Sequence, residues 1–284
     1  MEKIRLIAVD VDGTLLDDRK ELPAANREAL LAASRAGVLV TIASGRMTPR
    51  IEAIESRLGV DCVILAYNGG KVVSPRREGR EVIVHQPVPP DVASELIDYS
   101  HDTGLLLNFY HEEVLFGRPG GDRDRMIDLY TARTGAAYVL EQDYERLRGI
   151  APTKLILLAD PPEVERLLEA FRERFAGRAF ITRSDPEYLE ITAPDVNKGT
   201  ALRLLARHYD TPLANVMALG DADNDLGLIE TAGFGVAVAN AHAHVKAAAA
   251  AVTQRTNNEG AVAEAIDRWV LGGEDITPAR ELTA

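Results

Sequence analysis

The chain has 284 residues, of which 46% are apolar and 27% charged, as in folded globular proteins and unlike disordered ones. Its formal net charge is −12, so we expect neither nucleic acid nor membrane as a partner. Cys62 is the single cysteine, which excludes an internal disulfide, and its apolar surroundings predict a buried thiol. No apolar run reaches membrane-spanning length and no signal-peptide pattern is present, so we expect a cytoplasmic protein.

The first seventy residues alternate between strand and helix patterns. The predicted elements are a strand at 4–9, a helix at 23–36, a strand at 38–43, a helix from Thr48 to Gly59 and a strand at 62–67. The first strand is a nearly continuous apolar run, as expected for a parallel strand that is covered on both faces. This alternation predicts a doubly wound, Rossmann-like parallel sheet with helices on both faces.

The same pattern returns late in the chain. It predicts a helix at 197–209, a strand at 216–220, a helix at 223–232 and a strand at 235–239. The segment between the two halves instead predicts a helix around Val92–Tyr99, a strand at 105–110, a helix at 123–133, a strand at 154–159, a helix at 162–176 and strands at 179–183 and 188–192. This middle segment has the mixed order of an α+β unit.

Two Pro-containing stretches, 86–90 and 193–196, flank the middle segment and are typical of linkers. We therefore predict a core domain of residues 1–84 and 193–284, with residues 85–192 as an inserted α+β cap domain. One continuous large sheet is the alternative. The insertion is favoured because every chemically suggestive residue lies outside the middle segment. Residues 272–284 are predicted to be a loose tail.

The first chemically suggestive motif, Asp10-Val-Asp12-Gly13-Thr14, directly follows the first strand. Ligands of open α/β sheets bind at the carboxyl ends of the strands, where this motif lies. Two carboxylates so close together are costly there unless a cation lies between them or one is protonated. By itself, however, the motif is equally typical of an ordinary turn, because Asp-Gly is a common turn dipeptide.

Two further segments place polar groups at the same edge. Ser44-Gly45-Arg46 follows the second strand with a hydroxyl, a flexible glycine and a cation, although alone it is more typical of a solvated loop. Lys198 follows Asn197 at the start of a helix, where a positive charge opposes the helix dipole. That misfit favours a bound anion beside the free N–H groups.

The most specific segment is Gly220-Asp221-Ala-Asp223-Asn224-Asp225, which follows the strand at 216–220. Three carboxylates and an amide in six residues suit Mg²⁺, which prefers oxygen ligands. The segment lacks the closing glutamate of an EF-hand, so we exclude that alternative.

These segments, taken in order, resemble the haloacid dehalogenase superfamily, and most closely its Cof-type phosphatases with a large α/β cap. The resemblance covers nearly the whole chain. Asn68-Gly69-Gly70, Tyr188-Leu-Glu-Ile191 and Ala237-Val-Ala-Asn240-Ala241 support it. Three departures are visible: Ser44 in place of a commoner Thr, Gly70 in place of a usual Ala, and Leu228 where many relatives have Met. None of them touches the chemistry, so we expect an active enzyme.

The resemblance implies a phosphoric monoester hydrolase that uses Mg²⁺. Asp10 would be the nucleophile that forms an aspartyl-phosphate, and Asp12 the general acid and base. The metal would bind the side chains of Asp10 and Asp221 and the backbone carbonyl of Asp12. Phosphate or substrate would be bound by Lys198 with Thr14, Ser44, Gly45, Arg46 and Asn68, and Asn224 and Asp225 would support the site without contacting the metal.

Alternatives remain at this point. The sequence barely separates a phosphatase from an enzyme that transfers a phosphoryl group as a phosphohexomutase does. A phospho-accepting signalling domain would lack a carboxylate at the position of Asp12 and the inserted cap, and a catalytically silent binding module is disfavoured by the intact motifs. We expect a small phosphomonoester as the substrate and a monomer or homodimer. His242 and His244 lie two apart in a predicted helix, so we expect them on different faces and not as a metal pair.

Overall fold

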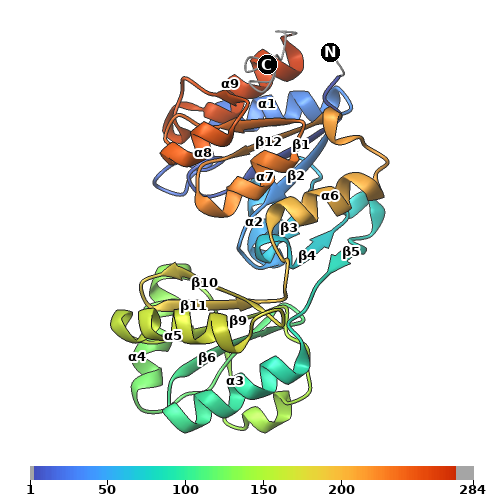
Figure 1. Cartoon of the computed structure of the whole chain (residues 1–284). Coiled ribbons are helices and arrows are strands. Elements are labelled where there is room, and N and C mark those ends of the chain that lie inside the picture. The colour runs from blue at the N-terminus through green and yellow to red at the C-terminus, as the bar shows by residue number, and fades with distance from the viewer. Residues whose placement is uncertain (1–2, 273–284) are drawn as a thin grey trace. The chain divides into compact units, whose positions relative to one another are not determined.

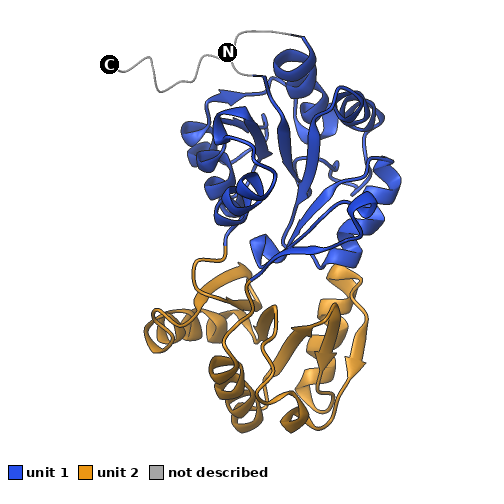
Figure 2. Cartoon of the chain, turned by 90° about the vertical axis from the view of Figure 1, so that its right-hand side faces the viewer, with its two compact units in different colours: residues 1–85, 197–284 blue, residues 86–196 orange. Residues whose placement is uncertain are grey.

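The structure, a computed structural model, describes residues 3–272 of the chain. It divides into two compact units, Met1–His85 with Asn197–Ala284 (unit 1) and Gln86–Val196 (unit 2), which Figure 2 distinguishes by colour. Both divisions fall beside the Pro-containing stretches at 86–90 and 193–196. The predicted tail, apart from Gly272, lies outside the described residues. Within the described part of the chain, no helix is long and apolar enough to cross a membrane.

Unit 1 is built on an eight-stranded sheet with the order β14-β13-β12-β1-β2-β3-β4-β5. Its strands are β1 (Leu6–Asp10), β2 (Leu39–Ala43), β3 (Val63–Ala66), β4 (Lys71–Val73), β5 (Val82–His85), β12 (Val216–Gly220), β13 (Phe234–Ala237) and β14 (Ala251–Val252). The strands from β14 to β3 pair in parallel, whereas β4 and β5 extend the sheet antiparallel. The predicted parallel sheet is confirmed, with an antiparallel edge that the sequence did not indicate.

Two layers of helices cover this sheet (Figure 1). The helices of unit 1 are α1 (Ala24–Arg35), α2 (Thr48–Leu58), α6 (Lys198–His208), α7 (Leu226–Thr231), α8 (Ala243–Ala248) and α9 (Ala261–Ile266). Helix α1 contacts α2 and α9, whereas α7 contacts α6 and α8. On the α6 side, Leu6 and Ala8 of β1 pack with Leu202 and Leu205 in one apolar cluster. Because β1 is buried along its whole length, its final residue is held firmly in place.

The register of the parallel strands sets the position of the motifs. Asp10 at the end of β1 pairs with Ala43 at the end of β2, and Val9 pairs with Leu219 of β12. The segments that follow these three strands therefore leave the sheet at the same edge. They carry the motifs that begin at Asp10, Ser44 and Asp221.

Unit 2 contains a six-stranded sheet with the order β10-β11-β9-β6-β7-β8. Its strands are β6 (Leu106–His111), β7 (Val114–Gly117), β8 (Tyr138–Leu140), β9 (Lys154–Leu158), β10 (Phe180–Asp185) and β11 (Tyr188–Thr192), and its helices are α3 (Pro90–Thr103), α4 (Asp122–Thr134) and α5 (Pro161–Arg174). Only β7 and β8 pair in parallel. One apolar cluster joins α3 and α5 to the sheet through Phe109, Leu155 and Leu189. No strand of this unit pairs with the sheet of unit 1.

Several elements differ from the sequence prediction. Strands β4, β5, β7, β8 and β14 were not predicted, because runs of two to four residues are too short to show periodicity. The helix predicted at 223–232 divides into a 3₁₀ turn, η5 (Asp223–Asp225), and the short helix α7. Helix α8 ends at Ala248 within an alanine-rich stretch, and β14 follows it. Cys62 is buried as expected, and Trp269 is also buried and packs against Phe234.

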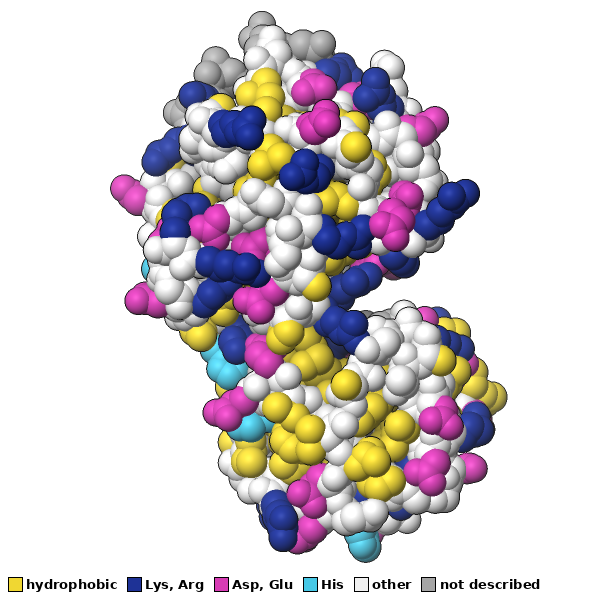
Figure 3. All heavy atoms as spheres, turned by 180° about the vertical axis from the view of Figure 1, so that it is seen from behind, with side chains coloured by type: hydrophobic (Ala, Val, Ile, Leu, Met, Phe, Trp, Pro, Cys, Tyr) yellow, Lys and Arg dark blue, Asp and Glu magenta, His cyan; other side chains and the backbone are white. Residues whose placement is uncertain are grey.

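On the face drawn in Figure 3, Lys and Arg side chains are interspersed with Asp and Glu in both units. A phosphate-bearing ligand therefore needs a local group of positive charges and N–H donors to be bound.

Candidate active site

A buried lysine links the first and last motifs. Lys198, the first residue of α6, donates from Nζ to Oδ1 of Asp10 at 2.5 Å and to Oδ1 of Asp225 at 2.6 Å. The Lys198 side chain is 0% exposed, and the two carboxylates are almost as deeply buried. Burial alone would lower the pKa of Lys198, but the two ion pairs outweigh it and raise that pKa. The ammonium group is therefore charged, as a ligand for an anion requires.

Asp10 lies in the same buried group. Its burial, reinforced by the charge of Asp225 and opposed by Lys198, raises the pKa of Asp10 to about 8. Burial and the charge of Asp225 also raise the pKa of Asp221. Excess negative charge is thus gathered around a single lysine. Such a group is stabilised when a cation binds between the carboxylates.

Asp225 holds Lys198 in place, and it also fixes the backbone of the acidic loop at 220–225. Its second oxygen, Oδ2, accepts hydrogen bonds from the backbone N–H of Asp221 at 3.1 Å and of Ala222 at 3.2 Å. Gly220 leaves room for this side chain, because a Cβ there would lie 2.4 Å from Cβ of Asp225. Asp225 therefore holds both the lysine and the backbone that carries Asp221.

The donor set of this site fits a hard divalent cation. Asp10, Asp221 and Asp225 each offer a carboxylate oxygen, and these oxygens all lie within 4.8 Å of one another. Thr14 donates from Oγ1 to Oδ1 of Asp221 at 3.0 Å, which orients that carboxylate. Oxygen ligands at this spacing suit Mg²⁺. Since Asp225 is already engaged by Lys198 and two amides, Asp10 and Asp221 are the side chains best placed to contact the ion.

The turn after β1 depends on a glycine. Gly13 has a φ of +84°, and a Cβ at this position would lie 2.4 Å from Oδ2 of Asp221. Its carbonyl accepts a hydrogen bond from Nδ2 of Asn240 at 2.8 Å, and Asn240 in turn accepts from the backbone N–H of Asn257 at 2.8 Å. Both the left-handed backbone and the close approach of Asp221 require a residue without a side chain.

The carboxylate of Asp12 is held by two cations. Arg46 donates from Nε to Oδ2 at 2.9 Å and from Nη2 to Oδ1 at 2.6 Å, and Lys20 donates to Oδ1 at 2.9 Å. Burial acts to raise the pKa of Asp12, but the hydrogen bonds and charges of Arg46 and Lys20 outweigh it and lower the pKa below its usual value. In this structure Asp12 is ionised, whereas the role of general acid requires it to be protonated.

Another group of predicted residues follows β2 and β3. The hydroxyl oxygen of Ser44 accepts from the backbone N–H of Arg46 at 3.3 Å, and the carbonyl of Ser44 accepts from the N–H of Asn68 at 3.0 Å. Asn224 donates from Nδ2 to Oδ1 of Asn68 at 3.1 Å. A Cβ at Gly45 would lie 3.0 Å from Nδ2 of Asn68, so glycine allows this close approach. The loops after β2, β3 and β12 are thereby joined.

Some residues of this region were not predicted from the sequence. Lys20, Asn240 and Asn257 contact Asp12, Gly13 or each other, but they lie in loops, where no periodic pattern marks them. The motif Ala237-Val-Ala-Asn240-Ala241 was the only signal for any of them.

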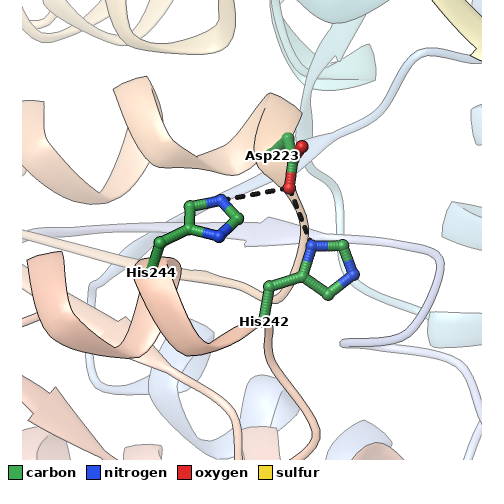
Figure 4. A group of neighbouring side chains, drawn as sticks. All are labelled: Asp223, His242 and His244. Atoms are coloured by element: carbon green, nitrogen blue, oxygen red, sulfur yellow. Dashed lines mark hydrogen bonds and ion pairs between the residues drawn. The ribbon is translucent and has the colours of Figure 1, made fainter.

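The expectation that His242 and His244 lie on different faces of one helix was wrong. His242 has φ −58° and ψ 147° and precedes α8, so the two rings are not arranged as on a helix. Both rings turn toward Asp223 (Figure 4).

Comparison with known proteins agrees with the fold and gives the family. The family model of the haloacid dehalogenase-like hydrolases matches residues 7–266. The 5-amino-6-(5-phospho-D-ribitylamino)uracil phosphatase YcsE of Bacillus subtilis is 30% identical over 270 residues, which cover 94% of this chain and 96% of that protein. The HMP-PP phosphatase of Cronobacter sakazakii is 29% identical over 232 residues, which cover 82% and 83% of the two chains. The crystal structure of TM0651 from Thermotoga maritima is 32% identical, with a TM-score of 0.85 and coverage of 93% and 97%.

A parallel α/β sheet with acidic loops at its carboxyl edge, a buried lysine and an inserted α+β unit defines a phosphoric monoester hydrolase. The chain belongs to the haloacid dehalogenase-like hydrolases, as a phosphatase of the Cof type.

Proposed function

We propose that this phosphatase hydrolyses a small phosphorylated metabolite through an aspartyl-phosphate on Asp10. The observation that carries the proposal is the buried group of Asp10, Lys198 and Asp225 at the end of β1, with Asp221 beside it. A carboxylate oxygen of Asp10 attacks phosphorus, and the bond from phosphorus to the leaving alkoxide breaks. Water then attacks the phosphorus of the intermediate, which releases inorganic phosphate and restores the Asp10 carboxylate.

The remaining residues of the site bind and orient the phosphoryl group. Lys198 supplies a fixed positive charge, and the hydroxyl groups of Thr14 and Ser44 supply donors to its oxygens. Asp225 keeps Lys198 and the backbone of Asp221 in position. Mg²⁺, held by Asp10, Asp221 and the backbone carbonyl of Asp12, would favour the ionised nucleophile and neutralise charge on the transferring group.

Asp12 is proposed as the general acid and base. It protonates the leaving alkoxide in the first step and takes a proton from the attacking water in the second. Because Arg46 and Lys20 keep it ionised, the proposal requires these cations to release its carboxylate when substrate binds. The freed guanidinium of Arg46, with Gly45 and Asn68 beside it, would then bind the substrate.

The names of the relatives support a small metabolite as the substrate. One relative is named as a phosphatase of HMP-PP and another as a phosphatase of 5-amino-6-(5-phospho-D-ribitylamino)uracil. Cofactor-related phosphates and sugar phosphates are therefore the substrates to test. Unit 2 is proposed to act as the cap that selects among them. We further propose that the protein is cytoplasmic, a monomer or homodimer, and without a nucleic-acid partner, in keeping with its net charge of −12.

The test is phosphate release from a panel of phosphorylated metabolites that contains both of these compounds, hexose phosphates and p-nitrophenyl phosphate. We expect release to cease in excess chelator and to return with Mg²⁺. Substitutions in unit 2 should change substrate preference and leave the Mg²⁺ dependence intact. A requirement for a sugar bisphosphate would indicate a mutase. Full activity in chelator after dialysis would exclude the proposed metal dependence.

A further inference from the structure

An exposed group of three side chains, Asp223, His242 and His244, is separate from the acidic group of Asp10, Asp221 and Asp225. Asp223 is the first residue of η5, His242 immediately precedes α8, and His244 lies in the first turn of that helix. Nδ1 of His242 lies 2.7 Å and Nε2 of His244 lies 3.1 Å from the same oxygen of Asp223, Oδ1 (Figure 4). The side chains are 57%, 54% and 77% exposed for His242, His244 and Asp223. All three are therefore open to an ion from solvent.

The backbone holds these side chains close together. The N–H of His242 donates to the carbonyl of Asp221 at 2.9 Å, which ties the loop before α8 to the acidic loop after β12. The carbonyl of His242 accepts from the N–H of Lys246 at 3.0 Å and so fixes the start of the helix. The two histidines and Asp223 thus converge because of the fold, although they lie about twenty residues apart in sequence.

The spacing is that of metal ligands. One atom from each side chain can be chosen such that all three lie within 4.8 Å of one another, and only one other such group, the acidic one, occurs among the described residues. Ligands bound at about 2.0–2.1 Å in a tetrahedron lie about 3.3 Å apart, which small rotations of exposed side chains can provide. Other exposed His–carboxylate contacts lack a third member: His101 and Asp102 lie 3.6 Å apart, and His111 and Glu112 lie 3.9 Å apart.

We propose that Asp223, His242 and His244 form a second metal site, which binds a divalent first-row transition ion such as Zn²⁺. Two imidazole nitrogens and one carboxylate oxygen suit Zn²⁺ or Cu²⁺, whereas Mg²⁺ prefers oxygen ligands and retains its waters. The two metal sites of the protein would therefore differ in chemistry. A bound ion would crosslink the loops that follow β12 and β13, and its remaining coordination positions would face solvent.

The experiment is calorimetric titration of the full chain, without a histidine tag, with Zn²⁺ in excess Mg²⁺, which keeps the acidic group occupied. We expect one Zn²⁺ per chain. His242→Ala, His244→Ala and Asp223→Asn should each weaken binding at least tenfold, since even outer-shell changes cost about 10–100-fold in affinity. His101→Ala, which removes an exposed histidine that belongs to neither group with metal-ligand spacing, should bind Zn²⁺ like the unchanged protein.

Electron paramagnetic resonance of bound Cu²⁺ gives a second readout. Coupling to two imidazole nitrogens is expected in the unchanged protein, and coupling to one in either single histidine variant. Absence of saturable Zn²⁺ binding would overturn the proposal. If all three variants bound Zn²⁺ as tightly as the unchanged protein, the proposal would also be overturned, because the ion would then occupy a different place.

Discussion

Arg46 holds the carboxylate of Asp12 through both of its oxygens, with Nε 2.9 Å from Oδ2 and Nη2 2.6 Å from Oδ1. A bidentate pair of this kind fixes geometry as well as charge. It keeps the proposed general acid ionised. The proposed reaction therefore begins when the guanidinium of Arg46 leaves Asp12 and binds the substrate instead.

Removal of this guanidinium should change the pH dependence of the reaction. Arg46 lowers the pKa of Asp12, so Arg46→Met should raise it. With Mg²⁺ present to keep Asp10 ionised, Asp12 must be protonated for the first step, and kcat/KM therefore falls as pH rises through the pKa of Asp12. We expect this descending limb to move to higher pH in Arg46→Met, by about one unit. Lys20→Met should act in the same direction but less, since Lys20 is more exposed.

Arg166→Met serves as the control for this measurement, because Arg166 forms a surface pair with Glu163 and does not contact Asp12, Lys20 or Arg46. Its pH profile of kcat/KM should match that of the unchanged enzyme. A descending limb that stays in place in Arg46→Met would show that Asp12 does not supply the proton.

The acid role of Asp12 also predicts a dependence on the leaving group. Asp12→Asn keeps the backbone carbonyl and nearly the same shape but removes the titrating proton. A sugar alkoxide needs that proton to leave, an effect of about 10²–10⁴-fold, whereas nitrophenolate does not. First-turnover rates by rapid quench should therefore fall much further with a sugar phosphate than with p-nitrophenyl phosphate. Equal losses would assign Asp12 a structural or metal-site role alone.

Gly13 provides a test of the turn that places the acidic group. Gly13→Ala introduces a Cβ 2.4 Å from Oδ2 of Asp221 at a φ of +84°. Gly79→Ala introduces the same residue at the same φ with nothing within 4 Å. Both should lose about 1–2 kcal/mol of unfolding free energy from backbone strain. Only Gly13→Ala should also lose phosphatase activity and Mg²⁺ affinity. Similar activity in the two variants would contradict the assigned role of Asp221.

Asp225 should control metal affinity without contacting the metal. Asp225→Asn weakens the hydrogen bonds that the carboxylate accepts from Lys198 and from the backbone N–H groups of Asp221 and Ala222. We expect Mg²⁺ affinity, measured by calorimetry, to fall about 10–100-fold. Glu230→Gln removes one negative charge from the exposed surface of α7 and should leave this affinity unchanged. Unaltered Mg²⁺ binding in Asp225→Asn would show that its contacts do not position the site.

The sequence was most informative where a strand ends. Asp10, Ser44 and Asp221 could be placed together because parallel strands bring their carboxyl ends to one edge of the sheet, and the structure confirms that sheet. Lys198 could be placed by its position at a helix start. The resemblance left open whether Asp225 fixes Lys198 or a metal-bound water, and the structure shows Lys198 donating to both Asp10 and Asp225.

Loops were the least predictable part. The approach of Lys20 to Asp12 depends on turn geometry that no period describes. The sequence analysis placed His242 inside a helix, but the helix α8 begins one residue later, at Ala243. Because of this one-residue error, His242 and His244 were expected on different faces, whereas both rings turn toward Asp223. The short strands β4 and β5 were missed because runs of three and four residues are too short to show a period.

The most direct test of the central claim is chemical identification of the phosphorylated residue. The enzyme is mixed with excess p-nitrophenyl phosphate and Mg²⁺, quenched in acid within the first turnovers and reduced with borohydride, which converts an acyl phosphate to an alcohol. Mass spectrometry should then find homoserine at position 10, and none in enzyme quenched without substrate. Asp10→Asn should form no such product and release no phosphate. An unmodified Asp10 during rapid turnover, or wild-type phosphate release by Asp10→Asn, would contradict the account.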